Sequence, residues 1–209
     1  MAANADSARG GERLQRRRER TARALLDAAR HVLAANGFHA TKIVDIARAA
    51  RVGVGTFYLY YPTKEACFVE LVEDSVARLR AELDRGRDAV DDPIEQSRAR
   101  IRTFFRFAQE NREVFRIVFW HGASFHHVVR RCQEGFITDL RDRIASGMAA
   151  SAFRRGDALI WAEAVIGMCQ QVLSWWIEQD VVSVEDLAES LSDLVLHGII
   201  APARADARD

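Results

Sequence analysis

Several features that would point to a specific chemistry are missing from this chain of 209 residues. Its three cysteines, Cys67, Cys132 and Cys169, are far apart and form no Cys-x-x-Cys pair, so neither a disulfide framework nor a zinc site is expected. The longest run without a charged residue covers residues 164–177, too short to cross a bilayer. Because the first residues form no apolar leader, we expect a cytoplasmic protein that makes no membrane contact.

Catalytic motifs are missing as well. There is no Gly-x-Ser-x-Gly elbow, no His-Glu-x-x-His pair and no phosphate-binding Gly-x-x-x-x-Gly-Lys loop. His121, His126 and His127 are close in sequence, but adjacent histidines cannot share one helix face, and no Glu-x-x-His arrangement accompanies them. We therefore expect no enzymatic activity, no metal and no cofactor. The apolar fraction of 49% still indicates an ordered core.

The chain also lacks a net charge, but its charges are unevenly distributed. Residues 1–65 hold 12 Lys and Arg against 6 Asp and Glu, a balance of +6, whereas residues 66–209 hold 18 against 24, a balance of −6. A basic end is what DNA phosphates would require of a binding surface. The alternative is a chance imbalance caused by an arginine-rich tail.

The most informative stretch begins at Gly37 and reads GFHATKIVDIARAARVGVGTFYLYYPTK. Apolar residues recur at helical spacing across residues 43–50, Gly37 can end the preceding helix, and the Thr41 hydroxyl can cap the next one. Residues 51–53 then form a turn before a second short helix over 54–60. Two short helices joined in this way predict a helix-turn-helix, whose second helix can enter the major groove of DNA.

The stretch resembles the TetR family of bacterial transcription regulators, with matches at fixed spacing and no gap. The matching positions are Gly37, Thr41, Ile46-Ala47, Ala50 to Gly53, Gly55 to Tyr58, Tyr60-Tyr61 and Lys64. Three positions depart from the commonest form: Arg51 replaces a turn glycine, Gly53 a capping serine and Val54 a polar residue. The operator sequence therefore does not follow from the resemblance.

The resemblance and the side-chain chemistry together imply a set of DNA-contacting residues. This set is Thr41, Val54, Gly55, Thr56, Tyr58, Tyr60 and Lys64. Hydroxyls and cations would meet phosphates or base edges, and Gly55 would permit a close approach. Phe57 and Tyr61 are expected to pack inward.

The implied function is a dimeric, sequence-specific regulator that binds a palindromic operator on double-stranded DNA. We expect a repressor that is released by a small apolar or aromatic effector. One alternative is a DNA-binding factor without an effector, architectural or regulated by another protein. A helical enzyme is a remote alternative.

Helical periodicity continues along the whole chain, so the fold class is predicted to be all-α. We expect a mobile basic arm over 1–18, a DNA-binding domain over 19–79 with the helix-turn-helix at about 42–61, and a helical regulatory and dimerisation domain over 80–209. The first firm helix is expected to start near Glu19. Thr63 is a predicted cap of the helix that links the domains, and breaks are expected over residues 85–93 and at Gly122.

The segment 158–179 is apolar around most of its circumference, and the last helix carries a companion stripe. This excess predicts pairing with a second copy, unless both stripes face the core of a single chain. The candidate interface residues are Leu159, Ile166, Leu173, Trp176, Leu187, Leu191 and Leu194. An apolar effector pocket would be lined by Phe104, Trp120, Trp161, Met168 and Trp175.

Overall fold

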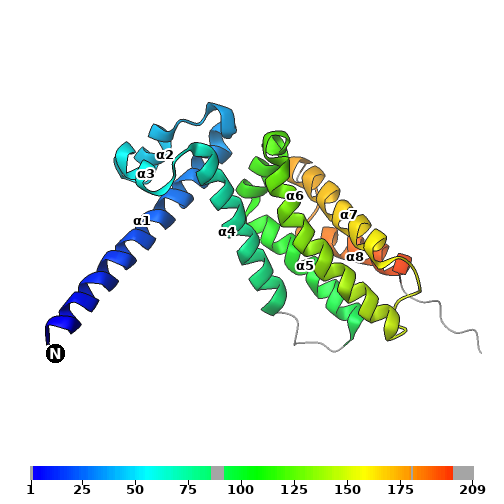
Figure 1. Ribbon diagram of the computed structural model, residues 1–209. Helices are drawn as coiled ribbons and strands as arrows, with labels where there is room; N and C mark the ends of the chain where they lie inside the picture. Colours follow the sequence, from blue (N-terminus) through cyan, green and yellow to red (C-terminus); the bar gives the residue numbers. More distant parts are fainter. Residues whose placement is uncertain (1, 86–91, 180, 200–209) are drawn as a thin grey trace, which may run out of the picture. The chain divides into compact units, whose positions relative to one another are not determined.

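The computed structural model describes residues 2–85, 92–179 and 181–199, and gives side chains there except at 2–10, 120–126 and 199. Every regular element within these ranges is a helix, which confirms the predicted all-α fold (Figure 1). The chain divides into two compact units, residues 1–74 and 75–209.

The N-terminal unit contains helices α1 (Ala2–Ala40), α2 (Ile43–Ala49) and α3 (Val54–Tyr60), and the start of α4 (Lys64–Arg85). The expected helix start near Glu19 is wrong, because α1 already begins at Ala2. Residues 11–20 are exposed and rich in Arg, Glu and Gln, which are good helix formers, so nothing in their composition opposes the helix.

The core of this unit is built from one face of each helix. Its largest fully buried side chains are Leu25, Leu33, Ile46, Phe57, Phe68 and Leu71. Gly37 leaves the helical conformation near the end of α1, with φ 76° and ψ 164°, a region that only glycine adopts without strain. The main chain can therefore turn from α1 into α2.

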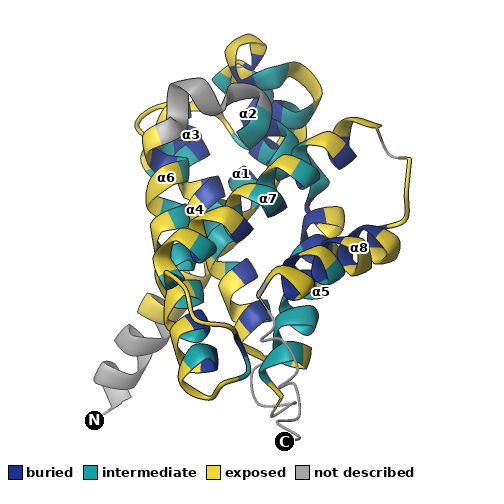
Figure 2. Ribbon diagram, turned by 90° about the vertical axis from the view of Figure 1, so that its right-hand side faces the viewer, coloured by how far each residue is buried: buried dark blue, intermediate teal, exposed yellow. Residues whose placement is uncertain are grey.

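The C-terminal unit consists of the rest of α4 and four further helices: α5 (Pro93–Glu110), α6 (Arg112–Ala149), α7 (Ala158–Gln179) and α8 (Val184–Ile199). α6 packs along α7 and α5 along α8, and the side of α8 that faces α5 is buried (Figure 2). The predicted break at Gly122 is wrong, because α6 runs through this glycine without interruption. Helical hydrogen bonds on both sides outweigh a cost of about 1 kcal/mol for one glycine.

Polar side chains mark where three helices begin. The Ala66 N–H donates to Thr63 Oγ1 at 3.1 Å, which confirms Thr63 as a cap of α4. Asp92 accepts from the N–H of Ile94 at 3.1 Å, directly before α5. Asp157 accepts from the first amides of α7 at 2.9 and 3.1 Å. Such caps satisfy helix-end donors that have no partner within the helix.

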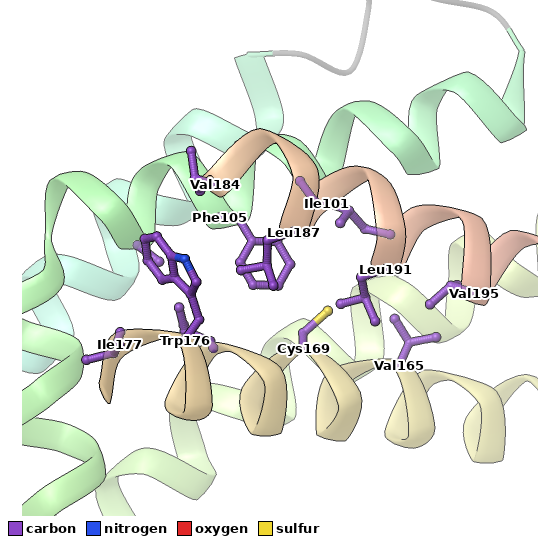
Figure 3. Packing of buried hydrophobic residues seen from close by; sticks show 13 residues of the cluster. Ile101, Phe105, Val165, Cys169, Trp176, Ile177, Val184, Leu187, Leu191 and Val195 are labelled. Carbon is purple, nitrogen blue, oxygen red and sulfur yellow. The ribbon is translucent and has the colours of Figure 1, made fainter. Parts of the chain in front are cut away.

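The main apolar cluster of the C-terminal unit lies between α5, α7 and α8 (Figure 3). Trp176 is 1% exposed, and its indole N–H donates to Val182 O at 2.8 Å. The guanidinium of Arg112 lies 4.8 Å from the Trp176 ring and donates to Ile177 O at 3.0 Å, which covers the end of α7. One side of α7 is thus used up by the core of a single chain.

Candidate nucleic-acid interface and effector cavity

The helix-turn-helix forms as expected, with one strained residue in its turn. The hydrogen bonds from Ala50 N to Ile46 O (2.9 Å) and from Val52 N to Ala47 O (2.9 Å) close the end of α2. Between them Arg51 adopts φ 57°, the left-handed region that favours glycine. This is the position where the resemblance led us to expect a turn glycine, and arginine occupies it at a conformational cost.

Helix α3 presents one side to solvent and buries the other. Phe57 is fully buried and Tyr61 is 8% exposed, which confirms that both pack inward. On the outer side Val54 is 39% exposed and Tyr58 54%. A Cβ added to Gly55 would meet no atom within 4 Å, so the outer side of α3 is unobstructed there. This geometry suits a helix that lies in a groove.

Tyr58 and Tyr60 differ in their surroundings. The Tyr58 ring stands edge-on to Phe57 with centroids 5.8 Å apart, so its body rests on the core while the side chain remains largely exposed. Tyr60 is half-buried, with its ring 6.5 Å from that of Tyr61, and Thr56 is also half-buried. Of the predicted hydroxyl contacts, Tyr58 is therefore the most accessible.

Thr41 does not cap α2, and this prediction is wrong. The side chain is 2% exposed, and its hydroxyl donates to Gly37 O at 2.7 Å and to Val32 O at 3.3 Å. The N-cap position of α2 belongs to Lys42, which makes no side-chain capping bond and is exposed. The capping assignment failed because Gly37 turns the hydroxyl back towards α1.

Lys64 is also occupied by the protein itself. Its ammonium donates to Phe38 O at 2.6 Å and to Thr41 O at 2.8 Å, and lies 4.4 Å from the centre of the Phe38 ring. These carbonyls belong to the last turn of α1 and the segment after it, so the lysine joins α4 to the end of α1. The geometry gives Thr41 and Lys64 positioning roles rather than open phosphate contacts.

The sequence analysis missed Leu59, which is 78% exposed, the highest value among the large apolar side chains of the described residues. The signal was present in the spacing: Leu59 lies four residues after Gly55 and next to Tyr58, hence on the outer side of α3. It was overlooked because leucine is ordinarily assigned to the core.

A cavity of about 670 Å³ lies in the C-terminal unit. Apolar and polar side chains both line it: Leu83, Ile101, Phe104, Leu140, Ile144, Phe153 and Val165 on the one hand, and Gln96, Ser97, Arg100, Asp139 and Arg143 on the other. The volume is within the ordinary range for small-molecule sites.

Of the predicted pocket residues, Phe104 lines this cavity. Trp161 is not among its lining residues and stacks instead under Arg154 at 4.7 Å. Met168 packs against the main apolar cluster, and Trp175 is 43% exposed. The Trp120 side chain lies outside the described residues. Large aromatic residues were favoured from composition, whereas the cavity is lined mainly by aliphatic and charged ones.

The predicted dimer residues fall into two groups. Leu173, Trp176, Leu187 and Leu191 are at most 6% exposed and belong to the core cluster, so their assignment to an interface is wrong. Leu159 is 48% exposed and Leu194 64%, and Ile166 is half-buried. The sequence could not decide between the stripes because both are apolar, and the partner helices α5 and α6 decided it.

An exposed seam of α7 remains after this correction. It is formed by Ile160, Ala164, Gly167, Gln171 and Trp175, which recur at intervals of three and four residues. Ile160 is 63% exposed. A Cβ added to Gly167 would meet nothing within 4 Å, so the middle of the seam carries no side chain at all.

Two of the cysteines are buried thiols. Burial raises the pKa of Cys67 to about 12, with Glu70 adding to the effect, and burial alone raises the pKa of Cys169 to about 12. Both therefore stay protonated at neutral pH and are poor nucleophiles. Among the residues with described side chains, no group of three His, Cys, Asp or Glu could hold a metal ion. The described helices include none that is long and apolar enough to span a membrane.

Comparison with known proteins matches both units. The family described as bacterial regulatory proteins of the tetR family matches residues 25–71, and that described as the tetracyclin repressor-like C-terminal domain matches residues 90–199. A *Bacillus subtilis* protein named as the uncharacterised HTH-type transcriptional regulator YdgC is 24% identical over 182 residues, which cover 84% of this chain and 91% of the relative.

Solved structures share the fold. The fatty acid degradation regulator FadR from Bacillus halodurans has a TM-score of 0.78 at 21% identity, covering 84% of this chain and 94% of that one. The regulator FadR from Bacillus subtilis, solved in complex with stearoyl-CoA, has a TM-score of 0.73 at 20% identity, covering 84% and 97%.

Proposed function

The chain belongs to the TetR family of bacterial regulatory proteins, and we propose that it is a homodimeric repressor whose operator binding is relieved by a small apolar effector. It is a DNA-binding transcriptional regulator, like its relatives. We also propose that it acts in the cytoplasm and has no catalytic activity of its own.

The observation that carries the DNA-binding assignment is the two-sided character of α3. Phe57 anchors the helix in the core, while Val54, Tyr58 and Leu59 stand out from it. Val54 and Leu59 offer methyl groups that suit the thymine methyl, and the Tyr58 hydroxyl can bond a phosphate or a base edge. We propose that these three side chains and Gly55 form the recognition surface, with Thr56 and Tyr60 at its margin.

Phosphate contacts are reassigned from buried to exposed cations. Lys42 is exposed at the start of α2, and Arg48 has 77% of its side chain exposed although it lies 3.6 Å from Asp45. Lys64 and Thr41 hold α1, α2 and α4 in place instead. We propose that Lys42 neutralises a phosphate, and that Lys64 affects DNA binding only through the geometry of the unit.

The proposed dimer interface is the exposed seam of α7, continued by Leu159 and by Leu194 on α8. Glycine in the middle of a helix costs about 0.5–1 kcal/mol relative to alanine, and within one chain no close neighbour of Gly167 accounts for it. A second helix packed closely over this point would account for it. Two-fold pairing would also present two copies of α3 to a palindromic operator.

The proposed effector site is the cavity of the C-terminal unit, lined in large part by aliphatic side chains. An apolar ligand there would contact Leu83, which belongs to α4, the helix that also supplies Lys64 to the N-terminal unit. Arg100 donates to Leu83 O at 3.2 Å from the same cavity. We propose that the ligand favours a different position of α4, and that it shifts the population away from the operator-binding state by its higher affinity for the other state.

The complex of a structurally similar regulator with stearoyl-CoA supports an apolar chain as the ligand class. The test is an electrophoretic mobility shift on operator DNA selected from a random duplex pool. A salt-sensitive shift that a fatty acid or its coenzyme A thioester abolishes is the expected result. A shift that no apolar ligand affects would favour a regulator without a small-molecule effector.

A further inference from the structure

The polar side of the cavity is built on three charged side chains from α5 and α6. Arg100 Nη2 lies 2.7 Å from Asp139 Oδ2, and Arg143 Nε lies 3.3 Å from the same oxygen. Each of these side chains is largely buried, with 20%, 34% and 20% of the surface of Arg100, Asp139 and Arg143 exposed. Two guanidinium groups therefore bond one carboxylate oxygen in a partly desolvated place.

Positive charge is in excess at this point. Asp142 also lines the cavity, but 65% of its side chain is exposed and its Oδ1 accepts two bonds from Arg141, at 2.9 and 2.8 Å. Asp142 is thus neutralised by an arginine outside the cavity lining, which leaves Asp139 as the single buried carboxylate beside Arg100 and Arg143. A buried guanidinium cannot lose its proton, so the excess can only be balanced by an anion from outside the cluster.

One donor of the cluster has no acceptor. Arg143 Nη2 is buried, and among the described residues no acceptor lies within hydrogen-bonding distance of it. A buried donor left in this way costs roughly 1–3 kcal/mol, more when it is charged, and native proteins retain few of them. The guanidinium fork suits a carboxylate or a phosphate, because both present oxygens at matching spacing.

The rest of the lining is apolar. Next to the arginines the cavity wall is formed by Ile101, Phe104, Leu140, Ile144, Phe153 and Val165. A ligand that fills the cavity and also reaches Arg143 must therefore combine an apolar body with an anionic end. A neutral hydrocarbon or a free inorganic anion would use only one of the two surfaces.

We propose that the cavity binds an acidic amphiphile, an apolar chain whose carboxylate or phosphate group is held by Arg143 and faced by Arg100. Arg143 keeps its Nε bond to Asp139 and offers the outer edge of its guanidinium, Nη2, to the ligand. This inference rests on the proposed function, since it specifies the chemistry of the effector site. The anionic group can come from a free fatty acid or from the phosphates of an acyl thioester of coenzyme A.

The test compares decanoate, decanol and decanoyl-CoA, with binding to the full-length protein measured by tryptophan fluorescence and calorimetry. We expect decanoate or decanoyl-CoA to bind more tightly than decanol. Arg143→Met should weaken the anionic ligand about tenfold or more, as expected for a lost charge-assisted bond, and leave decanol unchanged. Unchanged decanol binding also shows that the variant is folded. The matched control is Arg141→Met, which removes the same charge from α6 outside the cavity.

The outcomes separate this inference from the function on which it rests. Loss of decanoate binding in Arg143→Met identifies a carboxylate, and loss of decanoyl-CoA binding alone identifies the phosphates. Equal affinity for decanol and both anions, or equal losses in the two arginine variants, overturns the anion site but leaves the apolar effector standing. If none of the three ligands binds, the apolar effector fails as well, while operator binding in the mobility shift remains a separate result.

Discussion

Replacing Lys64 by methionine separates a positioning role from a phosphate contact. The variant loses two hydrogen bonds from the ammonium, to Phe38 O at 2.6 Å and Thr41 O at 2.8 Å, and its place 4.4 Å from the Phe38 ring. A bond from a charged donor contributes about 1.5–3 kcal/mol when buried. Since Lys64 is half-buried and water can reach the freed carbonyls, we expect a loss of about 2 kcal/mol from the N-terminal unit.

Two assays distinguish the roles. All four tryptophans lie in the C-terminal unit, so circular dichroism detects both units while tryptophan fluorescence reports only the second. Lys64→Met should lose part of its helical signal at lower denaturant concentration, and at low temperature it should retain the wild-type salt dependence of operator binding. The control Lys42→Met should keep wild-type stability and lower the salt slope by about 0.9. A Lys64→Met protein with unchanged stability and a reduced salt slope would refute the assignment.

Three further changes test other parts of the structure. Arg51→Gly should raise the stability of the N-terminal unit by up to about 1 kcal/mol in urea titration, because φ is 57° there, whereas Arg51→Ala should give no gain. Gly167→Glu should give a folded monomer in sedimentation experiments, since its side chain has open space within one chain but would meet the proposed partner helix, while Gly11→Glu should remain dimeric. Burial raises the pKa of Cys169 from 9.0 to about 12, so its contribution to stability should be complete below pH 9.0 and decline as the pH rises towards 12. Cys169→Ala should flatten this alkaline decline, and an identical pH profile for both proteins would contradict the cause given.

The helix-turn-helix could be predicted from the sequence because its information is local. A glycine with positive φ, a short turn and the burial of every third or fourth apolar residue fix α2 and α3 within a few residues. Phe57 and Tyr61 were assigned correctly for the same reason. The roles of Thr41 and Lys64 were not, since they depend on where α1 ends relative to α4, a contact between residues 38 and 64 that no local pattern encodes.

The C-terminal unit was harder to derive. The helix 158–179 was recognised as buried on most sides, but which side faces its own chain depends on packing against α5, α6 and α8. Trp176 therefore looked like an interface residue and lies in the core, whereas Gly167 gave no apolar signal and marks the proposed interface. The cavity was missed for a related reason: Arg143 and Arg100 come together only across two helices.

The most direct test of the account is selection of bound sequences from a random duplex pool at fixed salt, with the full-length protein, followed by release of the selected DNA with decanoate or decanoyl-CoA. The account predicts a palindromic consensus, with one half-site for each copy of α3, and release by at least one of these ligands. No enrichment above the starting pool, or a single half-site bound by one copy of the chain, would contradict it.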